Sequence, residues 1–533
     1  MTVSRGVAAL ILFLVLIQPN HPGAMTWGAL LVFPLELPAI LLGMVALGPG
    51  RVGRIVRGIL TGLLTVIVVL KCADFVSFTA LARGFNPVAD LALVDAFVRL
   101  LVGSLGPWLA GLAVIGAVFA TLLVAAVLWW ALAQWATFPR SASVARRVAV
   151  PAAVATVVAG ADVVQTMGGL SLPFKIPGTA FSARVGAERV NTVQRTIAQL
   201  RAFRTAAQED SLAEVATLLD RIDRDVLIIF VESYGRASLD TDFHASVHRQ
   251  TLERYGTRLA GLGLSLRSGL LAAPTRGGQS WLTHATFANG LWVDNQVSYG
   301  AVLSSGRETL FHLAARHGFR TAAVMPQITL DWPEADRMGF ETVLAAKNLG
   351  YAGLPFNWVT MPDQFTLAAL DRLVRDRPDG RPLLAQVALA SSHAPWVPVP
   401  EVIPWEEIGD GTVFNDVAQS GDPPDVVWRD RDRVRAQYRL AIDYSLSAVF
   451  EYAALHAEDP PLMIVIGDHQ AAAFVALDDR PDVPFHVIGP EHLVKMLSDI
   501  APDPGLLPRN KVFLNQMDIM RDSLLTAYST ELD

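Results

Sequence analysis

The sequence predicts two parts: an α-helical membrane unit, then an α/β unit with a mainly parallel sheet and helices on both faces. The membrane prediction rests on charge, because only five of the 50 acidic residues fall within the first 170 positions. The α/β prediction rests on short apolar runs that alternate with helical patterns after residue 222. A chain of 533 residues is also too long for a single compact core.

Composition excludes some classes of function. The formal net charge of −7 argues against a nucleic-acid partner, since proteins that bind nucleic acids are usually basic. Cys72 is the single cysteine, which rules out an intramolecular disulfide and a zinc site built from cysteines. The oligomeric state is left open.

Residues 1–170 contain five apolar stretches long enough, or nearly so, to cross about 30 Å of hydrocarbon. They lie near residues 6–18, 25–48, 55–71, 103–135 and 148–168. We therefore expect a membrane domain of about five helices. Glu36 is the clear acid inside a span, between Pro34 and Pro38. Such a residue either serves function or faces a neighbouring helix at a local kink.

Arginines in the short loops predict the orientation. Loops between the second and third and between the fourth and fifth spans contain Arg51, Arg54, Arg57, Arg140, Arg146 and Arg147, whereas residues 19–24 contain no Lys or Arg. Positive loops stay in the cytoplasm. An odd number of crossings then puts the chain after residue 170 outside. We expect a multi-pass protein of the cytoplasmic (inner) membrane with its soluble domain on the periplasmic or extracellular side.

Residues 171–221 are expected to form an amphipathic connector, which either lies on the membrane surface or packs on the soluble domain. Residues 222–500 follow as the soluble α/β domain and 501–533 as a C-terminal tail. Strands are expected at 226–231, 321–325, 383–389, 462–466 and 484–488, and helices at 246–261, 308–317, 364–376 and 431–456.

Polar clusters follow three of these strands. Glu232 ends the first, Ser391, Ser392 and His393 follow the third, and Asp468 with His469 follows the fourth. In parallel sheets, ligands bind beyond the carboxyl ends of the strands. Two carboxylates and an imidazole from separate strands can converge on a divalent cation. The alternatives are that Glu232 caps a helix or pairs with Arg236, and that the Asp-His pair is a salt-linked turn.

The run Pro274–Trp281 supplies two candidate nucleophiles, Thr275 and Ser280, together with Arg276. Glycines in the run let the backbone approach a ligand closely. A bound metal can activate a serine by stabilising its alkoxide. The alternative is an ordinary Gly-rich turn.

The motifs FVESYG at 230–235, SSHAPW at 391–396 and IGDHQ at 466–470 resemble, in their order, the membrane-anchored branch of the alkaline phosphatase/sulfatase superfamily. That branch includes lipoteichoic acid synthases, phosphoglycerol transferases and phosphoethanolamine transferases. The resemblance implies an alkaline-phosphatase-like fold and one divalent ion, Mn²⁺ in the first place and Mg²⁺ or Zn²⁺ otherwise. It makes Glu232, Asp468 and His469 metal ligands.

The same resemblance assigns the other site residues. The family nucleophile stands nine positions before an Asn-Gly-Leu triplet, and Asn289 counts back to Ser280, which would also contact the metal. The resemblance implies substrate contacts for Trp332 and His393, with His393 also aiding catalysis. Arg276 or Arg337 would bind phosphate, because Pro333-Glu334 stand where lipoteichoic acid synthases have Asn and Arg.

Two other departures matter. Gln470 replaces a family glycine. Residues 272–276, AAPTR, resemble the sulfatase Cys-x-Pro-Ser-Arg motif with Ala272 in place of the cysteine, which argues against sulfate-ester hydrolysis and keeps Thr275 as the second-choice nucleophile.

The function expected from this resemblance is metal-dependent phosphotransfer. The enzyme would move a phosphoglycerol or phosphoethanolamine head group from a membrane phospholipid to an envelope glycan or lipid acceptor, through a covalent Ser280 intermediate. One alternative is a membrane-bound phosphodiesterase of the same fold. Another is a catalytically silent scaffold that binds the envelope.

Overall fold

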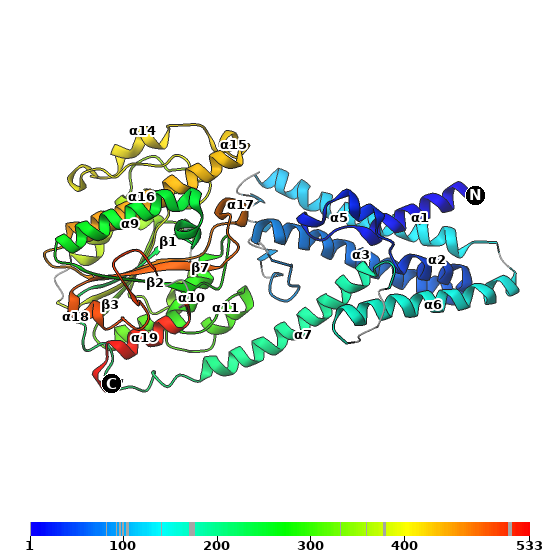
Figure 1. The fold of residues 1–533 in the computed structure, drawn as a ribbon, viewed down its shortest axis with the longest axis horizontal. Coiled ribbons are helices and arrows are strands. Elements are labelled where there is room, and N and C mark those ends of the chain that lie inside the picture. Colours follow the sequence, from blue (N-terminus) through cyan, green and yellow to red (C-terminus); the bar gives the residue numbers. More distant parts are fainter. Residues whose placement is uncertain are drawn as a thin grey trace. The chain divides into compact units, whose positions relative to one another are not determined.

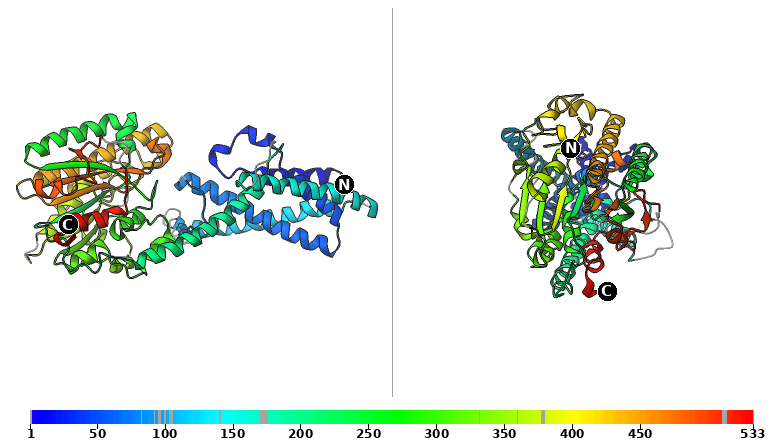
Figure 2. Two further views of the ribbon diagram at one scale, coloured as in Figure 1. Left: turned by 60° about the horizontal axis from the view of Figure 1, so that its bottom comes forward. Right: turned by 90° about the vertical axis from the view of Figure 1, so that its left-hand side faces the viewer.

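The computed structural model describes residues 2–532 except 82, 92, 95–96, 99–100, 103–105, 140, 170–175, 331, 359, 377–379 and 510–513. The chain forms two compact units, Met1–Leu200 and Arg201–Asp533 (Figures 1 and 2). Arg140 and the first residues of the expected connector, 171–175, lie outside the described residues.

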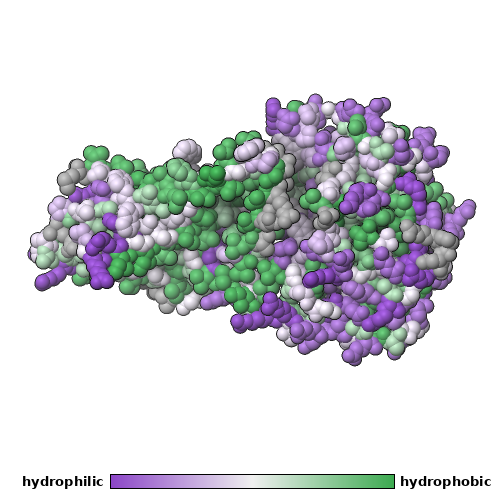
Figure 3. Space-filling view, turned by 180° about the vertical axis from the view of Figure 1, so that it is seen from behind, coloured by the Kyte–Doolittle hydropathy of each residue, from purple (hydrophilic) through white to green (hydrophobic). Residues whose placement is uncertain are grey.

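The first unit is a bundle of apolar helices. They are α1 (Thr2–Ile17), α2 (Glu36–Leu47), α3 (Arg51–Leu81), α5 (Pro107–Ala136) and α6 (Ala142–Thr166), followed by the start of α7 (Phe181–Gln208). On the face shown in Figure 3, apolar side chains predominate along the middle of this unit, and polar side chains are more frequent on the other. Three helices among the described residues are long and apolar enough to cross a membrane, namely Arg51–Thr79, Pro107–Ala136 and Ala142–Thr166.

The two remaining expected spans correspond to shorter helices. α1 has 16 residues and α2 has 12. At about 1.5 Å per residue, α2 extends only about 18 Å, less than the hydrocarbon thickness of about 30 Å. The stretch expected at 25–48 is divided, because Trp27–Leu31 form a short 3₁₀ helix and α2 begins only at Glu36. The count of five spans stays a prediction.

Buried polar side chains join the start of α7 to the other helices of the first unit. Lys71 is fully buried and donates a hydrogen bond of 2.8 Å to the Ser182 hydroxyl. Glu36 Oε1 accepts the Ala183 backbone N–H at 2.9 Å. These contacts give Glu36 a structural partner and fix where α7 begins.

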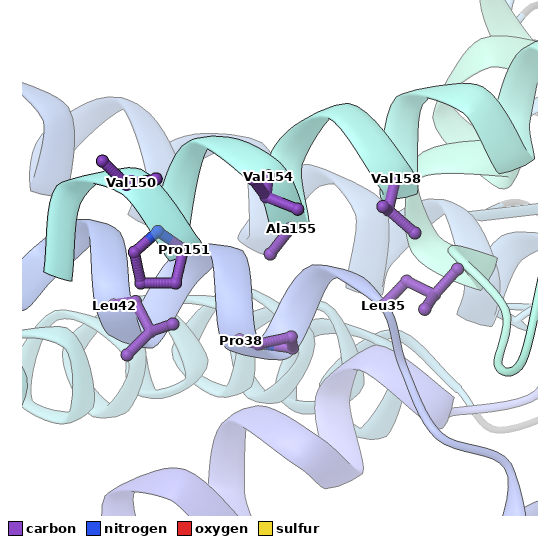
Figure 4. Close-up of a pocket in the computed structure, with 8 residues that line it drawn as sticks. All are labelled: Leu35, Pro38, Leu42, Val150, Pro151, Val154, Ala155 and Val158. Atoms are coloured by element: carbon purple, nitrogen blue, oxygen red, sulfur yellow. The ribbon is translucent and has the colours of Figure 1, made fainter.

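A crevice of about 500 Å³ lies between α2 and α6, with Pro38 and Pro151 on the two helices (Figure 4). Its lining consists of Leu35, Pro38, Leu42, Val150, Pro151, Val154, Ala155 and Val158. Because these side chains are all apolar, the crevice provides none that could bind a charged head group.

The second unit is built on one mixed sheet. Its strands are β1 (Val226–Val231), β2 (Ser265–Ala272), β3 (Arg320–Met325), β4 (Thr342–Ala345), β5 (Leu383–Ala388), β6 (Leu462–Gly467), β7 (Asp482–Gly489), β8 (Asp503–Pro504) and β9 (Asn515–Gln516). The order is β4-β3-β5-β1-β6-β7-β2-β8, with β9 beside β2. The strands from β4 to β6 run parallel, whereas β7, β2 and β8 pair antiparallel.

All five strands expected from apolar runs are present. The mainly parallel sheet describes the β4–β6 half, and the expected strand at 484–488 is antiparallel to β6. β2 was not expected because its sequence, SLRSGLLA, mixes polar and apolar residues and contains Gly269. The four-residue β4 is too short for a pattern.

The side chains of β1 divide between the two faces of the sheet. Leu227, Ile229 and Val231 join the core beneath α9 (Asp242–Gly261), α13 (Asp363–Leu370) and α16 (Arg431–Leu455). Val226, Ile228 and Phe230 join the core beneath α10 (Ser280–Asn289), α12 (Leu310–Arg316) and α19 (Ile519–Ala527). Figure 1 shows α9 and α16 on one side of the sheet and α10 and α19 on the other.

The C-terminal segment belongs to the sheet unit. Met517, Met520, Leu525 and Tyr528 are fully buried in the same core as Phe230. The residues expected as a tail, 501–533, thus supply β8, β9 and α19. Turns and prolines interrupt the apolar positions of this segment. The helical pattern therefore extends over only a few residues, and it does not predict α19 from the sequence.

Candidate active site

Two carboxylates and an imidazole meet at the carboxyl ends of β1 and β6. These parallel strands pair with Val231 opposite Gly467, so the next residues of each, Glu232 and Asp468, lie side by side. Glu232, Asp468 and His469 are each at most 4% exposed. One possible ligand atom from each lies within 4.8 Å of the other two. The three residues thus form a group that could hold a metal ion.

The hydrogen bonds around this group orient its free atoms inward. Asp468 Oδ1 accepts the backbone N–H groups of Ser233 at 2.7 Å and of His469 at 2.6 Å. His469 Nδ1 donates to the Gln470 carbonyl at 3.1 Å, which leaves the lone pair on Nε2. That Nε2 is buried, makes no hydrogen bond within the described part of the chain, and lies 3.1 Å from Glu232 Oε1.

The electrostatics of the group fit a bound cation. Burial, and then the neighbouring charge of Glu232, raise the pKa of Asp468 well above its ordinary value. Burial opposes ionisation of Glu232 as well, but the charge of His469 holds the pKa of Glu232 well below its usual range. Burial lowers the pKa of His469, yet the two carboxylates outweigh it and raise the pKa to about 9. A divalent cation would let both carboxylates ionise around a neutral imidazole.

Ser280 lies against this group, whereas the hydroxyl of Thr275 contacts another threonine. Ser280 is the first residue of α10, and its Oγ donates to Glu232 Oε2 at 3.0 Å. The side-chain alternation of β1 explains the contact, because Glu232 continues the face of Phe230, which packs beneath α10. The Thr275 hydroxyl instead lies 3.2 Å from that of Thr283.

Arg236 has ion-pair partners other than Glu232. Its guanidinium pairs with Asp240 at 2.9 Å and with Asp482 at 2.7 Å. Glu232 remains directed at Ser280 and His469, in keeping with a ligand rather than a helix cap.

Backbone strain is concentrated around the same residues. Ser233, Gln279 and Trp396 adopt φ angles of 58°, 67° and 62°. Each stands one to three residues from a candidate site residue: Glu232, Ser280 and His393. Residues other than glycine rarely adopt positive φ angles. Such backbone strain tends to occur where a site needs one fixed geometry.

The loop after β5 reaches the site through the backbone of Glu232. Ser392 Oγ donates to the Glu232 carbonyl at 2.7 Å. His393 Nδ1 donates to the Ala394 carbonyl at 2.6 Å, which leaves Nε2 as its free nitrogen. The charge of His393 is one of the influences that lower the pKa of Glu232. His393 therefore lies near the cluster without belonging to it.

The other expected substrate residues make different contacts. Trp332 packs against Phe340, with ring centres 6.2 Å apart. Arg276 pairs with Asp479 at 3.7 Å. Arg337 is an exposed residue at the end of the 3₁₀ helix Pro333–Arg337. The substrate roles of these three residues stay predictions.

Two polar side chains beside the site were missed in the sequence. Gln327 Nε2 donates to Glu232 Oε2 at 3.4 Å and to the Leu389 carbonyl at 2.8 Å. His284 stands one helical turn after Ser280, and its ring lies 4.2 Å from that of Phe230. Gln327 comes two residues after β3, so the rule used for the other strand ends would have found it. His284 could have been found as well, because it lies one helical turn after Ser280 and therefore on the same face of the helix.

The sequence from residue 224 to 524 matches the sulfatase family model. A comparison with well-characterised protein sequences gives no match.

Several solved structures are similar to the chain. The lipoteichoic acid synthase LtaP from Listeria monocytogenes is 13% identical over 52% of this chain and 69% of its own, with a TM-score of 0.34. The phosphoglycerol transferase GacH from Streptococcus pyogenes, in complex with sn-glycerol-1-phosphate, is 14% identical over 62% and 81%, with a TM-score of 0.37. The periplasmic domain of EptC from Escherichia coli is 14% identical over 58% and 92%, with a TM-score of 0.34.

The mixed sheet and its strand-end cluster are those of an α/β enzyme fold with a possible metal site. Since the matching family model covers more than half of its length, this chain belongs to the sulfatase family.

Proposed function

We propose that this protein is a metal-dependent phosphotransferase that moves a phospholipid head group to an envelope acceptor. The observation that carries the proposal is the 3.0 Å contact from the Ser280 hydroxyl to Glu232, within a buried group of two carboxylates and one imidazole. A hydroxyl held against metal-binding carboxylates is the arrangement expected of an activated nucleophile.

In the first step, the Ser280 hydroxyl gives up its proton, and Oγ attacks the phosphorus of a phosphatidylglycerol or phosphatidylethanolamine head group. The bond between phosphorus and the diacylglycerol oxygen breaks, and that oxygen takes a proton and leaves as diacylglycerol. The head group remains on Ser280 as a phosphodiester. Ser280 begins a helix of ten residues, so its N-terminal N–H groups and dipole favour negative charge at this point.

In the second step, an acceptor hydroxyl attacks the same phosphorus, and the Ser280–phosphorus bond breaks. His393, with Nε2 free, takes the proton from the acceptor, and Ser280 Oγ regains one as it leaves. Glu232, Asp468 and His469 would hold Mn²⁺, Mg²⁺ or Zn²⁺, which as a Lewis acid would stabilise negative charge on the phosphoryl and serine oxygens.

Helices long enough to cross a membrane support a lipid donor, because they would hold the enzyme where phospholipids are. The positive loops support a catalytic unit on the periplasmic or extracellular side of the cytoplasmic membrane. The acceptor would be an envelope glycan or lipid exposed on that side.

The test compares Ser280→Ala with Thr275→Ala in the full-length protein. Each is incubated with head-group-labelled phosphatidylglycerol or phosphatidylethanolamine and Mn²⁺, and the labelled peptide is located by mass spectrometry. We expect Ser280→Ala to lose the labelled peptide and Thr275→Ala to keep it. If the Ser280→Ala protein still carries a labelled peptide, Thr275 becomes the candidate nucleophile. Equal release of glycerol phosphate or ethanolamine phosphate with and without acceptor would make the enzyme a hydrolase.

A further inference from the structure

A stacked pair of tryptophans stands beside the candidate active site and has no role in the chemistry proposed above. Trp428 follows α15 (Pro424–Val427) and is 43% exposed, whereas Trp396 is buried. Their rings are 5.7 Å apart and only 5° from parallel. Phe474, from α17 (Ala473–Ala476), meets the Trp428 ring at 6.2 Å and 66°. We call Trp396, Trp428 and Phe474 the aromatic platform.

Hydrogen bonds tie this platform to the loop that carries His393. Trp396 Nε1 donates to the Ser392 carbonyl at 2.7 Å, and the Ser392 hydroxyl donates to the Glu232 carbonyl at 2.7 Å. Trp428 Nε1 donates to the Pro395 carbonyl at 3.3 Å. Two side chains therefore separate the exposed Trp428 from the backbone of a candidate metal ligand.

All parts of the platform come from loops at one edge of the sheet. Trp396 lies on the loop after β5, and Phe474 lies on the loop after β6, five residues beyond His469. The segment 401–430, which carries Trp428, connects the first of these loops to α16. In Figure 1, α15 of this segment lies near one end of α16. The platform thus lies at the same edge of the sheet as Glu232, Asp468 and His469.

The exposed face of Trp428 has the chemistry of a sugar-binding surface. The indole stacks with an offset on Trp396 and its N–H is already used, while 43% of the residue remains exposed to solvent. The C–H face of a pyranose ring packs on such a surface, while its hydroxyls need polar partners at the rim. Arg429 and Asp425, an exposed ion pair at 3.1 Å, provide a donor and an acceptor next to Trp428.

The local charge favours a neutral glycan over an anionic membrane surface. Segment 401–430 contains eight acidic residues and one arginine. Such a surface repels anionic lipid head groups, which usually attract basic segments. It does not repel a neutral hexose.

We propose that Trp428 is the acceptor subsite, where a neutral pyranose ring of an envelope glycan stacks while its reacting hydroxyl faces Ser280. The acceptor role rests on the function proposed above, but binding of the sugar does not. The ligand bound there is an oligosaccharide of neutral hexoses. Trp396 stacks on the Trp428 ring and holds it in place.

The first experiment measures binding without chemistry. Full-length Ser280→Ala protein in detergent is titrated with neutral gluco-oligosaccharides of four to six units, followed by tryptophan fluorescence. Adding Trp428→Ala is expected to weaken binding about tenfold or more, the scale of a lost ring stack on an aromatic side chain. Trp428→Tyr should retain most of the affinity. Val413→Ala, an exposed apolar position in the same segment, is the matched control and should change nothing.

The second experiment uses active protein and separates the two half-reactions. Trp428→Ala should raise the KM for the oligosaccharide about tenfold, while the Ser280 intermediate forms from labelled lipid at the unchanged rate. Equal losses in both half-reactions, or an unchanged KM, would overturn the proposal. So would loss of binding to phosphatidylglycerol vesicles in place of oligosaccharide. If wild-type protein forms no intermediate yet Trp428→Ala still weakens oligosaccharide binding, the phosphotransferase proposal fails and the sugar subsite stands.

Discussion

The two units each bury charged side chains, but they use them differently. In the membrane unit, charges have partners in the fold: Asp162 accepts two hydrogen bonds from Arg184, at 2.9 and 2.5 Å, and one from the Ala180 N–H at 2.8 Å. In the sheet unit, Glu232 and Asp468 are buried side by side with one imidazole between them. The first arrangement holds helices together, whereas the second leaves charge for a ligand to balance.

This difference teaches how to separate structural from functional buried charge. Removing one member of a satisfied pair leaves the other uncompensated and destabilises the fold. Removing one of two crowded carboxylates relieves a cost that the fold already bears. The two clusters should therefore respond to neutralising substitutions with opposite changes in stability.

Glu232→Gln should have the largest effect. We expect metal affinity to fall by at least about 100-fold, more than the loss of a residue that only orients a ligand. After chelation, it is Asp468→Asn that should unfold at a higher temperature than wild type, because Asp468 is the carboxyl whose pKa is raised. Metal titration by calorimetry and thermal unfolding of full-length protein in detergent measure both. Unchanged affinity together with lower stability would make Glu232 a structural residue.

Asp162→Asn should act in the opposite direction on stability. Arg184 loses its charged partner, which costs about 1–3 kcal/mol because Arg184 is partly exposed. Denaturant unfolding in detergent measures this cost. The double variant Asp162→Asn/Arg184→Gln should recover part of it. Metal affinity should stay at the wild-type value, and a fall would contradict the separation of the two clusters.

Gln327→Ala should weaken metal binding less than Glu232→Gln does. Gln327 orients Glu232 by a hydrogen bond, and the loss of such partners typically costs about 10–100-fold in affinity or activity. The measurement is the same titration. Gln419→Ala serves as the control, since Gln419 is exposed and donates to the Asn415 carbonyl one helical turn away. If Gln327→Ala and Gln419→Ala bind the metal with equal affinity, Gln327 has no role in orienting Glu232.

The smallest effect concerns two buried histidines of the sheet unit. Burial lowers the pKa of His248 and of His486 to about 3. Between pH 6.5 and pH 3 the unfolded chain binds a proton at each residue that the folded chain does not. Their neutral burial therefore costs nothing above pH 6.5 and destabilises the fold increasingly below it, by about 1 kcal/mol per pH unit for each residue.

Thermal unfolding between pH 7 and pH 5, with chelator present, tests this slope. His486→Gln keeps a partner for the Tyr234 hydroxyl and should make the slope shallower. A slope equal to that of wild type would show that His486 does not titrate in this range.

Much of the sheet could be predicted because local pattern and burial agree there. β1 matches its expected range of 226–231, and the apolar runs before His393 and Asp468 also form strands. Side-chain alternation then determines that Glu232 shares the α10 face, which a sequence can indicate once the strand is known. By contrast, Trp428 meets Trp396 only through tertiary packing between distant segments, which no local period encodes.

The lengths of the membrane helices could be predicted only in part. Hydropathy identified the long α3, α5 and α6, but it joined the 3₁₀ helix Trp27–Leu31 to α2 in one stretch. Apolar composition is the same in both segments, and the break depends on Pro34, whose neighbours bond to the chain near Thr179. A hydropathy window does not register such a contact.

The pairing of β1 with β6 has a consequence for how the protein matures. Val231 lies opposite Gly467, and the two carboxylates follow in step. A slip of one residue along either strand would turn one carboxylate to the opposite face of the sheet. Ligand affinity at this site would then report on correct strand pairing, because only the correctly registered chain assembles all three donors. Binding of an ion at this site would therefore require that β1 and β6 have already paired in the correct register.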